Sequence, residues 1–249
     1  MHPVVSKASR LILAGDVASA EQALVKIAED EGDGALVAVL EEIPAKDLVS
    51  ILREYDSGKE SVVNLLVTPD QFARAVVLEA KFGEKTHDIL QGMINSVIYA
   101  RPDEAEAYLA RLVETPEGCS TLGDYFEAHL EAFFCFALHG TFTPETFPDI
   151  PENSTLLHVL IRQLAEADFF PFEDEEGGEK LLKRAEIADS NWMETAWVLR
   201  YEVAEGFGPV FHTLHLRILK RIEAAAVAAL NQAQRVTKPE GDDGEESAI

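Results

Sequence analysis

Apolar residues recur every three or four positions through nearly the whole chain, and alternation with a period of two is almost absent. Val17, Ala20 and Leu24, for example, lie on one side of an expected helix. The carboxylate of Asp16 can cap the first turn of that helix. The periodicity predicts an all-α protein. We expect an irregular stack of about eleven short helices, arranged as a superhelix resembling helical repeats or as a bundle.

Short local signals mark several helix starts. Ser57 with Glu60 three residues later is a capping-box pattern that leads into an apolar run. Thr68 and Gln71 repeat the pattern, with Pro69 at the first helical position. Proline suits that position because the first-turn N–H groups have no partner inside the helix. We therefore expect a helix to begin at each of these two places.

The same periodicity predicts the helices of the second half of the chain. A longer, Phe-rich helix is expected to run from about Ser120 to His139. Gly206 and the pair Gly208-Pro209 are expected to separate the last two helices, because glycine and proline disfavour helix interiors. The helices expected after residue 140 are 154–167, 179–188, 191–205 and 210–235.

A change of character after residue 140 indicates a domain boundary. Pro144, Pro148 and Pro151 interrupt a polar stretch there, which is typical of a loop or linker. The expected organisation is an N-terminal helical unit (1–140), a Pro-rich linker or loop (141–153), a C-terminal helical unit (154–236) and a disordered acidic tail (237–249).

The charge balance narrows the range of partners. The chain holds 45 acidic residues against 21 basic residues, which gives a formal net charge of −24. Such a surface repels nucleic-acid phosphates and anionic lipids, and it favours cationic partners. We therefore expect no nucleic-acid binding, except that the protein could itself mimic nucleic acid. No run of about 18 apolar residues occurs, so no membrane span is expected.

The cysteines and the N-terminus indicate the compartment. Only two cysteines occur, Cys119 and Cys135, and Cys135 lies among three phenylalanines, where a buried thiol is expected. Two cysteines in a chain of this length do not make a disulfide framework. The first apolar stretch is short and is interrupted by Lys7 and Arg10, unlike the core of a signal peptide. We expect a cytoplasmic protein.

Two Leu-rich segments with a proline beside acidic residues carry a family resemblance. They read LVAVLEEIP (36–44) and VNLLVTPD (63–70). Residues 36–82 resemble the acidic N-terminal helical domain of MgtE-type magnesium transporters. The resemblance implies a right-angled stack of short helices with an acidic surface. It does not imply transport, because that family's nucleotide-binding regulatory module and membrane domain have no counterpart in this sequence.

The sequence contains no catalytic signature. Phosphate-binding glycine loops, the hydrolase Gly-x-Ser-x-Gly motif and the zinc motif His-Glu-x-x-His are all absent from it. His212 and His215 have a spacing that can direct two imidazoles toward one ion, but such a site needs further ligands. The alternative is that both histidines lie beside the apolar seam of the last helix and form local hydrogen bonds. We expect no metal and no cofactor.

Aromatic residues are the candidates for partner binding. Phe169, Phe170 and Phe172 surround a proline beside an acidic run, where they can anchor a partner that carries basic residues or pin the segment to the core. Trp192 and Trp197 belong to an aromatic stripe. That stripe is typical of core packing, and a groove for a partner helix is the alternative.

The last helix differs from the rest of the chain in charge and in composition. It carries Arg217, Lys220, Arg221 and Arg235 against Glu223 alone. A basic amphipathic helix can bind acidic partners or membrane surfaces, but docking on the acidic body of the same protein is the simpler interpretation. Its Ala-rich end permits close helix approach, so a homodimer through this helix is a further hypothesis.

The leading functional hypothesis is a non-enzymatic acidic helical scaffold or adaptor that binds another protein through a basic or aromatic surface of that partner. A metal- or ligand-dependent helical enzyme with a site assembled from distant residues is a second hypothesis. Mimicry of nucleic acid, which needs carboxylates spaced like phosphates along one side, is a third.

Overall fold

The computed structural model describes residues 1–55, 59, 61–83, 87–143 and 183–236, and these residues form helices without a single β-strand. The prediction of an all-α stack of short helices is confirmed. The first helices are α1 (Pro3–Leu13), α2 (Val17–Glu31), α3 (Asp33–Glu41), α4 (Ala45–Glu54), α5 (Val62–Leu66), α6 (Pro69–Phe82) and α7 (His87–Ile98). Those that follow are η1 (Pro102–Glu104), α8 (Ala105–Val113), α9 (Pro116–Phe126), η2 (Glu127–His129), α10 (Leu130–His139), α12 (Arg184–Ile187), α13 (Asn191–Tyr201) and α14 (Ala204–Val236).

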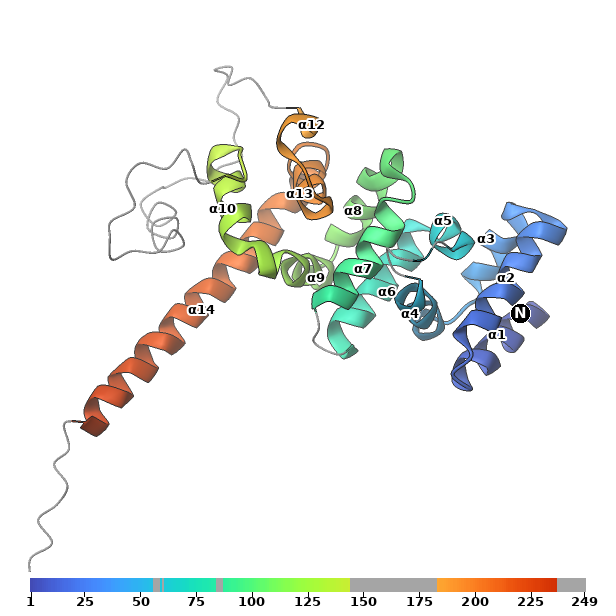
Figure 1. Cartoon of the computed structure of the whole chain (residues 1–249), viewed down its shortest axis with the longest axis horizontal. Coiled ribbons are helices and arrows are strands. Elements are labelled where there is room, and N and C mark those ends of the chain that lie inside the picture. Colours follow the sequence, from blue (N-terminus) through green and yellow to red (C-terminus); the bar gives the residue numbers. More distant parts are fainter. Residues whose placement is uncertain (56–58, 60, 84–86, 144–182, 237–249) are drawn as a thin grey trace, which may run out of the picture.

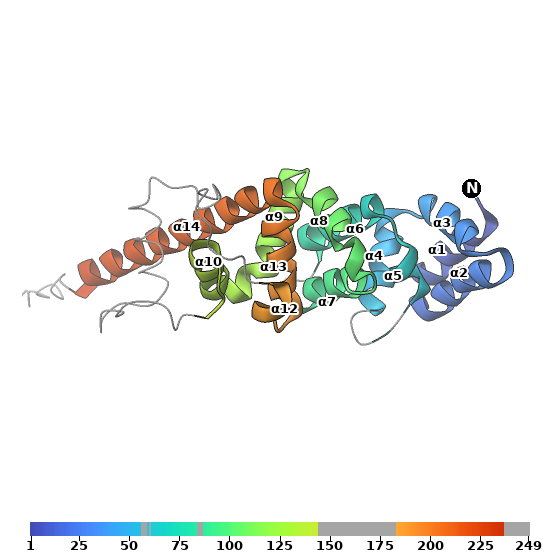
Figure 2. The ribbon, with the colours of Figure 1, turned by 90° about the horizontal axis from the view of Figure 1, so that it is seen from above.

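The helices form an elongated array that follows the order of the sequence (Figures 1 and 2). Helices α1–α3 pack together at one end, and α4, α6, α8 and α9 continue the stack toward the middle. Helix α13 packs on α8, and the first part of α14 packs on α8 and α9. The rest of α14 then projects away from this body in both views.

Side-chain caps start several helices where local signals predict them. The Asp16 carboxylate accepts a hydrogen bond from the backbone N–H of Ser19 at 3.1 Å. Thr68 and Gln71 form the complete capping box at the start of α6. The predicted cap Ser57 and its partner Glu60 lie outside the described residues. The cap of α5 is Ser61, whose hydroxyl accepts from Val63 at 3.1 Å.

The prediction of one helix from Ser120 to His139 is wrong, because this stretch is divided between two helices. Helix α9 starts earlier, at Pro116, and the short turn η2 separates it from α10. In one straight helix Phe126 and Phe133 would be about 10 Å apart along the axis, whereas their ring centroids here lie 4.6 Å apart. The break lets α10 pack on the base of α14, and residues 133–137 are all buried. Burial of phenylalanine therefore outweighs the local preference for a continuous helix.

Gly206 and Gly208-Pro209 do not separate two helices as predicted. They lie inside the first two turns of α14, and α13 already ends at Tyr201. Gly206 is required for packing, because a Cβ atom at this position would lie 2.4 Å from Cγ2 of Val113 in α8. Pro209 lies in the second turn of α14, where a proline removes one hydrogen bond within the helix and its ring crowds the carbonyl of Glu205.

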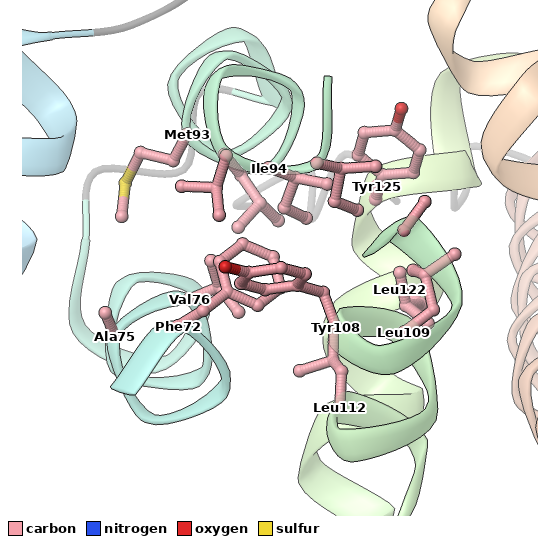
Figure 3. Packing of buried hydrophobic residues seen from close by; sticks show 14 of the residues in the cluster. Phe72, Ala75, Val76, Met93, Ile94, Tyr108, Leu109, Leu112, Leu122 and Tyr125 are labelled. Atoms are coloured by element: carbon pink, nitrogen blue, oxygen red, sulfur yellow. The ribbon is translucent and has the colours of Figure 1, made fainter. Parts of the chain in front are cut away.

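One cluster of buried side chains runs from α1 to the first half of α14. Figure 3 shows its middle, where the rings of Phe72 (α6) and Tyr108 (α8) meet edge to face with centroids 5.5 Å apart. The Tyr108 hydroxyl donates to the backbone oxygen of Val67 at 2.7 Å, so the buried phenol keeps a hydrogen-bond partner. The core is thus continuous from the middle of the stack to the base of α14.

Part of the predicted organisation lies outside the described residues. This applies to the linker from Pro144 onward, the helix at 154–167, the first residues of the helix at 179–188, and the tail at 237–249. The division into units at 141–153 therefore stays a prediction. In the described part, α13 and α14 of the C-terminal unit pack directly on α8 and α9 of the N-terminal unit.

Candidate interaction surface

The aromatic residues predicted to bind a partner are only partly described. Phe169, Phe170 and Phe172 lie outside the described residues. Trp192 is half-buried on α13 and stacks on His129 with ring centroids 4.3 Å apart and an angle of 3° between the planes. Trp197 is also half-buried, with its ring 5.1 Å from that of Tyr201. Both tryptophans pack against the core, and their predicted role in binding a partner stays a prediction.

The first half of α14 is seated on the body by an apolar side. Phe207, Val210, Leu214 and Ile218 are all nearly fully buried, and they recur every three or four residues, as a helix that covers a core requires. The Phe207 ring lies 5.4 Å from that of Phe133 on α10. This contact ties the base of α14 to the Phe-rich part of the core.

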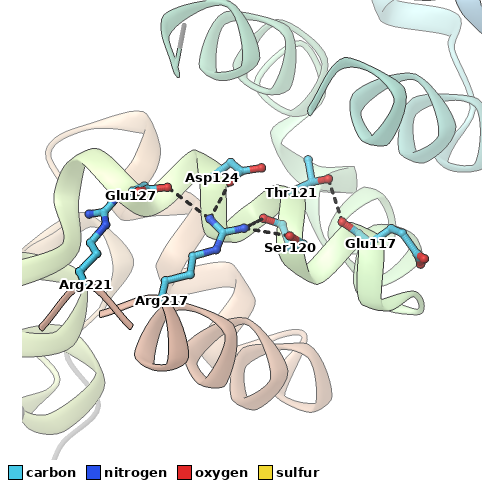
Figure 4. A network of polar contacts seen from close by, with 7 residues as sticks. All are labelled: Glu117, Ser120, Thr121, Asp124, Glu127, Arg217 and Arg221. Atoms are coloured by element: carbon cyan, nitrogen blue, oxygen red, sulfur yellow. Dashed lines mark hydrogen bonds and ion pairs between the residues drawn. The ribbon is translucent and has the colours of Figure 1, made fainter. Parts of the chain in front are cut away.

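A polar network fixes the same part of α14 to α9 (Figure 4). The guanidinium of Arg217 donates to Asp124 Oδ1 at 2.6 Å and to Glu127 Oε2 at 3.3 Å. Its second nitrogen donates to the backbone oxygen of Ser120 at 3.0 Å and to the Ser120 hydroxyl at 2.8 Å. Arg221 also forms an ion pair with Glu127. For Arg217 and Arg221, the prediction that the basic helix docks on its own acidic body is confirmed.

Replacing Arg217 by methionine is expected to lower the free energy of unfolding by about 2–3 kcal/mol, because the partly buried carboxylates of Asp124 and Glu127 lose the guanidinium that they share, although Glu127 keeps its ion pair with the exposed Arg221. The same substitution at Arg221 is the matched control. The Arg221 side chain is 61% exposed, so its loss is expected to cost less than about 1 kcal/mol. Urea unfolding followed by circular dichroism measures both values. Equal losses in the two variants would contradict the assignment of Arg217 as the main polar anchor.

Opposite this seat, and on the part of α14 that projects past it, the helix carries exposed apolar residues that the described body does not cover. Leu216, Leu219, Val227 and Leu230 are 42%, 41%, 51% and 63% exposed. Successive helical residues are rotated by about 100°, so Val227 lies about 180° around the helix from the buried Ile218. We call Leu216, Leu219, Val227 and Leu230 the outer side of α14. It faces away from the side that packs on the body.

The projecting half of α14 stays helical because of its composition. Residues 224–230 contain five alanines in seven positions, and alanine has the highest helix propensity. A helix that packs on nothing is marginal unless it is long and rich in such residues. Here it also continues directly from the seated half, so no new nucleus is needed. Helix-stabilising residues thus occupy a segment of α14 that lies outside the core formed by the described residues.

The periodicity of the sequence alone did not predict the outer side of α14 as a separate apolar surface. The seam through Phe211, Leu214 and Ile218 accounts for the strongest apolar stripe of this helix. A signal was nevertheless present, because Leu216, Leu219 and Leu230 form a second stripe with helical spacing on the other side. A helix with two apolar stripes has more apolar surface than one contact can bury.

The histidines of α14 do not come together with other ligands. His212 is exposed, whereas His215 is half-buried beside the rings of Phe134 and Phe211, at 6.4 Å and 6.2 Å. Within the described ranges, no group of three or more His, Cys, Asp or Glu side chains is arranged to hold a metal ion. The local-packing interpretation of His215 therefore agrees with its position.

Burial, and then the nearby His212, hold the pKa of His215 below its ordinary value of 6.5. The folded protein thus binds a proton less readily than the unfolded chain. This residue costs stability as the pH falls through 6.5 toward the lowered pKa, and it costs nothing above 6.5. We expect an NMR titration of His215 to give a pKa below 6.5, and His212→Gln to move that pKa upward. An unchanged pKa in the variant would contradict the electrostatic contribution.

A buried polar cluster joins α13 to α7 and α9. The Tyr99 hydroxyl lies 2.8 Å from Thr195 Oγ1, and the Tyr125 hydroxyl donates to Asn95 Oδ1 at 2.8 Å. Burial raises the pKa of Tyr99 to about 12 and raises the pKa of Tyr125 even further above its ordinary range. Both phenols are therefore neutral near pH 7, and the cluster holds the three helices together as ordinary hydrogen bonds do.

The described part of the chain contains no helix that is both long enough and apolar enough to cross a membrane. No family model matches the chain, and neither a search of curated proteins nor a search of solved structures finds a match. The resemblance of residues 36–82 to the N-terminal domain of MgtE-type transporters therefore stays a prediction. That stretch forms α3 to α6 in the structure.

Proposed function

We propose that this protein is a non-enzymatic helical scaffold that binds another protein through the outer side of α14. The observation that carries the proposal is the uncovered outer side of α14, where four large apolar side chains are exposed, two of them (Val227 and Leu230) on the part that projects beyond the body. Exposed apolar surface on a rigid helix costs solubility, and it is typical of a binding site for an apolar partner surface.

The net charge of the whole chain supports a scaffold with selective partners. A net charge of −24 repels other acidic proteins and attracts basic surfaces. A partner that offers apolar or aromatic side chains to α14, next to basic residues that meet the acidic body, satisfies both features. The two free thiols, Cys119 and Cys135, are buried, and burial raises the pKa of Cys135 to about 11. Unreactive buried thiols support the expected cytoplasmic setting.

Affinity capture with the full chain tests the proposal. The variant Leu219→Glu/Leu230→Glu places two charges on the outer side, and it is expected to recover a partner from native lysate at least about 10-fold less well than the wild type. The matched control is Leu13→Glu/Phe82→Glu, which adds the same charge at residues that are 84% and 72% exposed elsewhere. Equal recovery by all three proteins would remove the outer side of α14 from the proposal.

A further inference from the structure

The chain between α10 and α12 contains a second apolar stripe that needs a surface to cover it. Residues 144–182 make up most of this connection and lie outside the described residues. Within the helix predicted at 154–167, Leu157, Leu160 and Leu164 recur every three or four positions. Such a stripe is typical of a helix that packs on a neighbour along one side. The uncovered outer side of α14 is an apolar surface of the same kind.

Both ends of this connection lie beside the base of α14. Before it, the ring of Phe142 stacks on that of Phe136 with centroids 4.2 Å apart, and the Phe136 ring lies 6.2 Å from that of Phe207 in α14. After it, α12 packs on α13, which packs on α14. The outer side extends from Leu216, about 14 Å along the helix axis from Phe207, to Leu230, about 35 Å from it. The connection therefore starts and ends near one end of the outer side.

The lengths of the chain on either side of 154–167 favour one direction for the predicted helix. Fourteen helical residues span about 21 Å, which equals the rise along α14 from Leu216 to Leu230. The 11 residues from 144 to 154 reach at most about 36–40 Å, so residue 154 reaches Leu216 easily and Leu230 only at the limit. The 16 residues from 168 to 183 reach about 53–58 Å, which is enough to return from the Leu230 end. A helix at 154–167 therefore fits best parallel to α14.

Charge favours the same stretch as the occupant of the outer side. Residues 144–182 hold ten acidic and two basic residues. Residues 1–143 hold 24 acidic and 11 basic residues, so they repel an acidic stretch. From Arg217 onward α14 has the opposite balance, with four basic residues against Glu223, and Lys220 and Arg221 are exposed there. The acidic run at 173–176, which follows the predicted helix, is thus attracted to α14.

We propose that residues 154–167 form a helix that packs on the outer side of α14 and runs parallel to it. Leu157 then lies toward Leu219, and Leu164 lies toward Val227. The inference deepens the proposed function and rests on it for one consequence, which is that a partner protein competes with residues 154–167 for the same apolar side chains. Attachment within one chain gives an effective concentration of the order of mM. The apparent affinity of the partner is lowered to the fraction of molecules in which the outer side is free.

Disulfide formation within one chain tests the position and the direction. Leu164→Cys/Val227→Cys is oxidised in the full chain at about 1 µM, where contacts between chains are rare. Its disulfide is expected to form at least about 10-fold faster than that of Leu157→Cys/Val227→Cys, because the second pair lies about 10 Å farther apart along parallel helices. The native Cys119 and Cys135 are buried, so the wild type is expected to form no disulfide.

Hydrogen exchange of α14 gives a second measurement without new cysteines. Leu160→Glu places a carboxylate on the apolar stripe, and the matched control His158→Glu places one about 160° around the predicted helix. A helical extension that packs on nothing opens easily. Backbone amides at 222–231 are therefore expected to exchange at least about 10-fold faster in Leu160→Glu than in the wild type, and at the wild-type rate in His158→Glu.

Both measurements together decide the inference. The preferred disulfide together with faster exchange in Leu160→Glu alone supports it. Equal rates for the two cysteine pairs, disulfides between chains, or exchange that Leu160→Glu leaves unchanged would each overturn it. The proposed function fails separately. Equal partner recovery by Leu219→Glu/Leu230→Glu and its control removes that function even where the disulfide forms, and a loss of recovery supports it even where no preferred disulfide forms.

Discussion

Replacing Gly118 by alanine is expected to lower the free energy of unfolding by roughly 3 kcal/mol, the upper part of the range for overpacking. Gly118 lies in the first turn of α9, where its N–H donates to the capping hydroxyl of Thr115 at 3.1 Å. A Cβ atom here would lie 1.7 Å from the backbone oxygen of Leu112 in α8 and 2.7 Å from its carbonyl carbon. Backbone atoms cannot rotate away as a side chain can, so α8 and α9 must move apart.

The matched control for Gly118→Ala is Gly34→Ala in the first turn of α3. No atom lies within 4 Å of a Cβ built at that position. Alanine has a higher helix propensity than glycine, and it also lowers the conformational entropy of the unfolded chain. This variant is therefore expected to be neutral or more stable by about 0.5–1 kcal/mol. Urea unfolding measures both variants. A Gly118→Ala protein as stable as the wild type would show that the α8–α9 contact is not as close as described.

Local signals predicted helix starts, whereas contacts between distant residues decided how the helices run. Thr68 and Gln71 form their capping box as predicted, because cap and partner lie within one turn and need nothing else. The break at η2 follows from contacts of Phe133 with Phe126 and with Phe207. The second of these contacts joins residues that are far apart in the sequence, and no periodicity encodes it.

Gly206 shows the same limit for a single residue. Read along the chain, a glycine before Gly208-Pro209 is typical of a helix end. Its role is instead to let α14 approach Val113 of α8, which only the folded arrangement reveals. The candidate interaction surface could not be predicted from the sequence for a related reason. Which of the two apolar stripes of α14 is buried depends on how the helix docks, and that docking includes contacts of Arg217 with α9 that lie far apart in the sequence.

Replacing Phe133 by alanine is expected to lower the free energy of unfolding by about 3–5 kcal/mol, as for other fully buried aromatic residues. The Phe133 side chain is fully buried. Its ring lies 4.6 Å from that of Phe126 and 5.4 Å from that of Phe207, which belong to α9 and α14. The substitution leaves a cavity where the Phe-rich helix meets the base of α14. Phe133→Leu keeps most of the volume and is expected to cost less than about 1.5 kcal/mol.

Two probes of the same unfolding experiment show how far this loss extends. The only tryptophans of the chain, Trp192 and Trp197, both lie on α13, so their fluorescence reports the C-terminal helices, whereas circular dichroism reports all helices. Because α13 and α14 pack on α8 and α9, both probes are expected to give one common midpoint in urea, and Phe133→Ala is expected to shift both midpoints equally. A fluorescence midpoint that stays in place while the dichroism midpoint falls would show two independently folding units. It would also show that contacts across the interface, including that of Phe133 with Phe207, contribute little to stability.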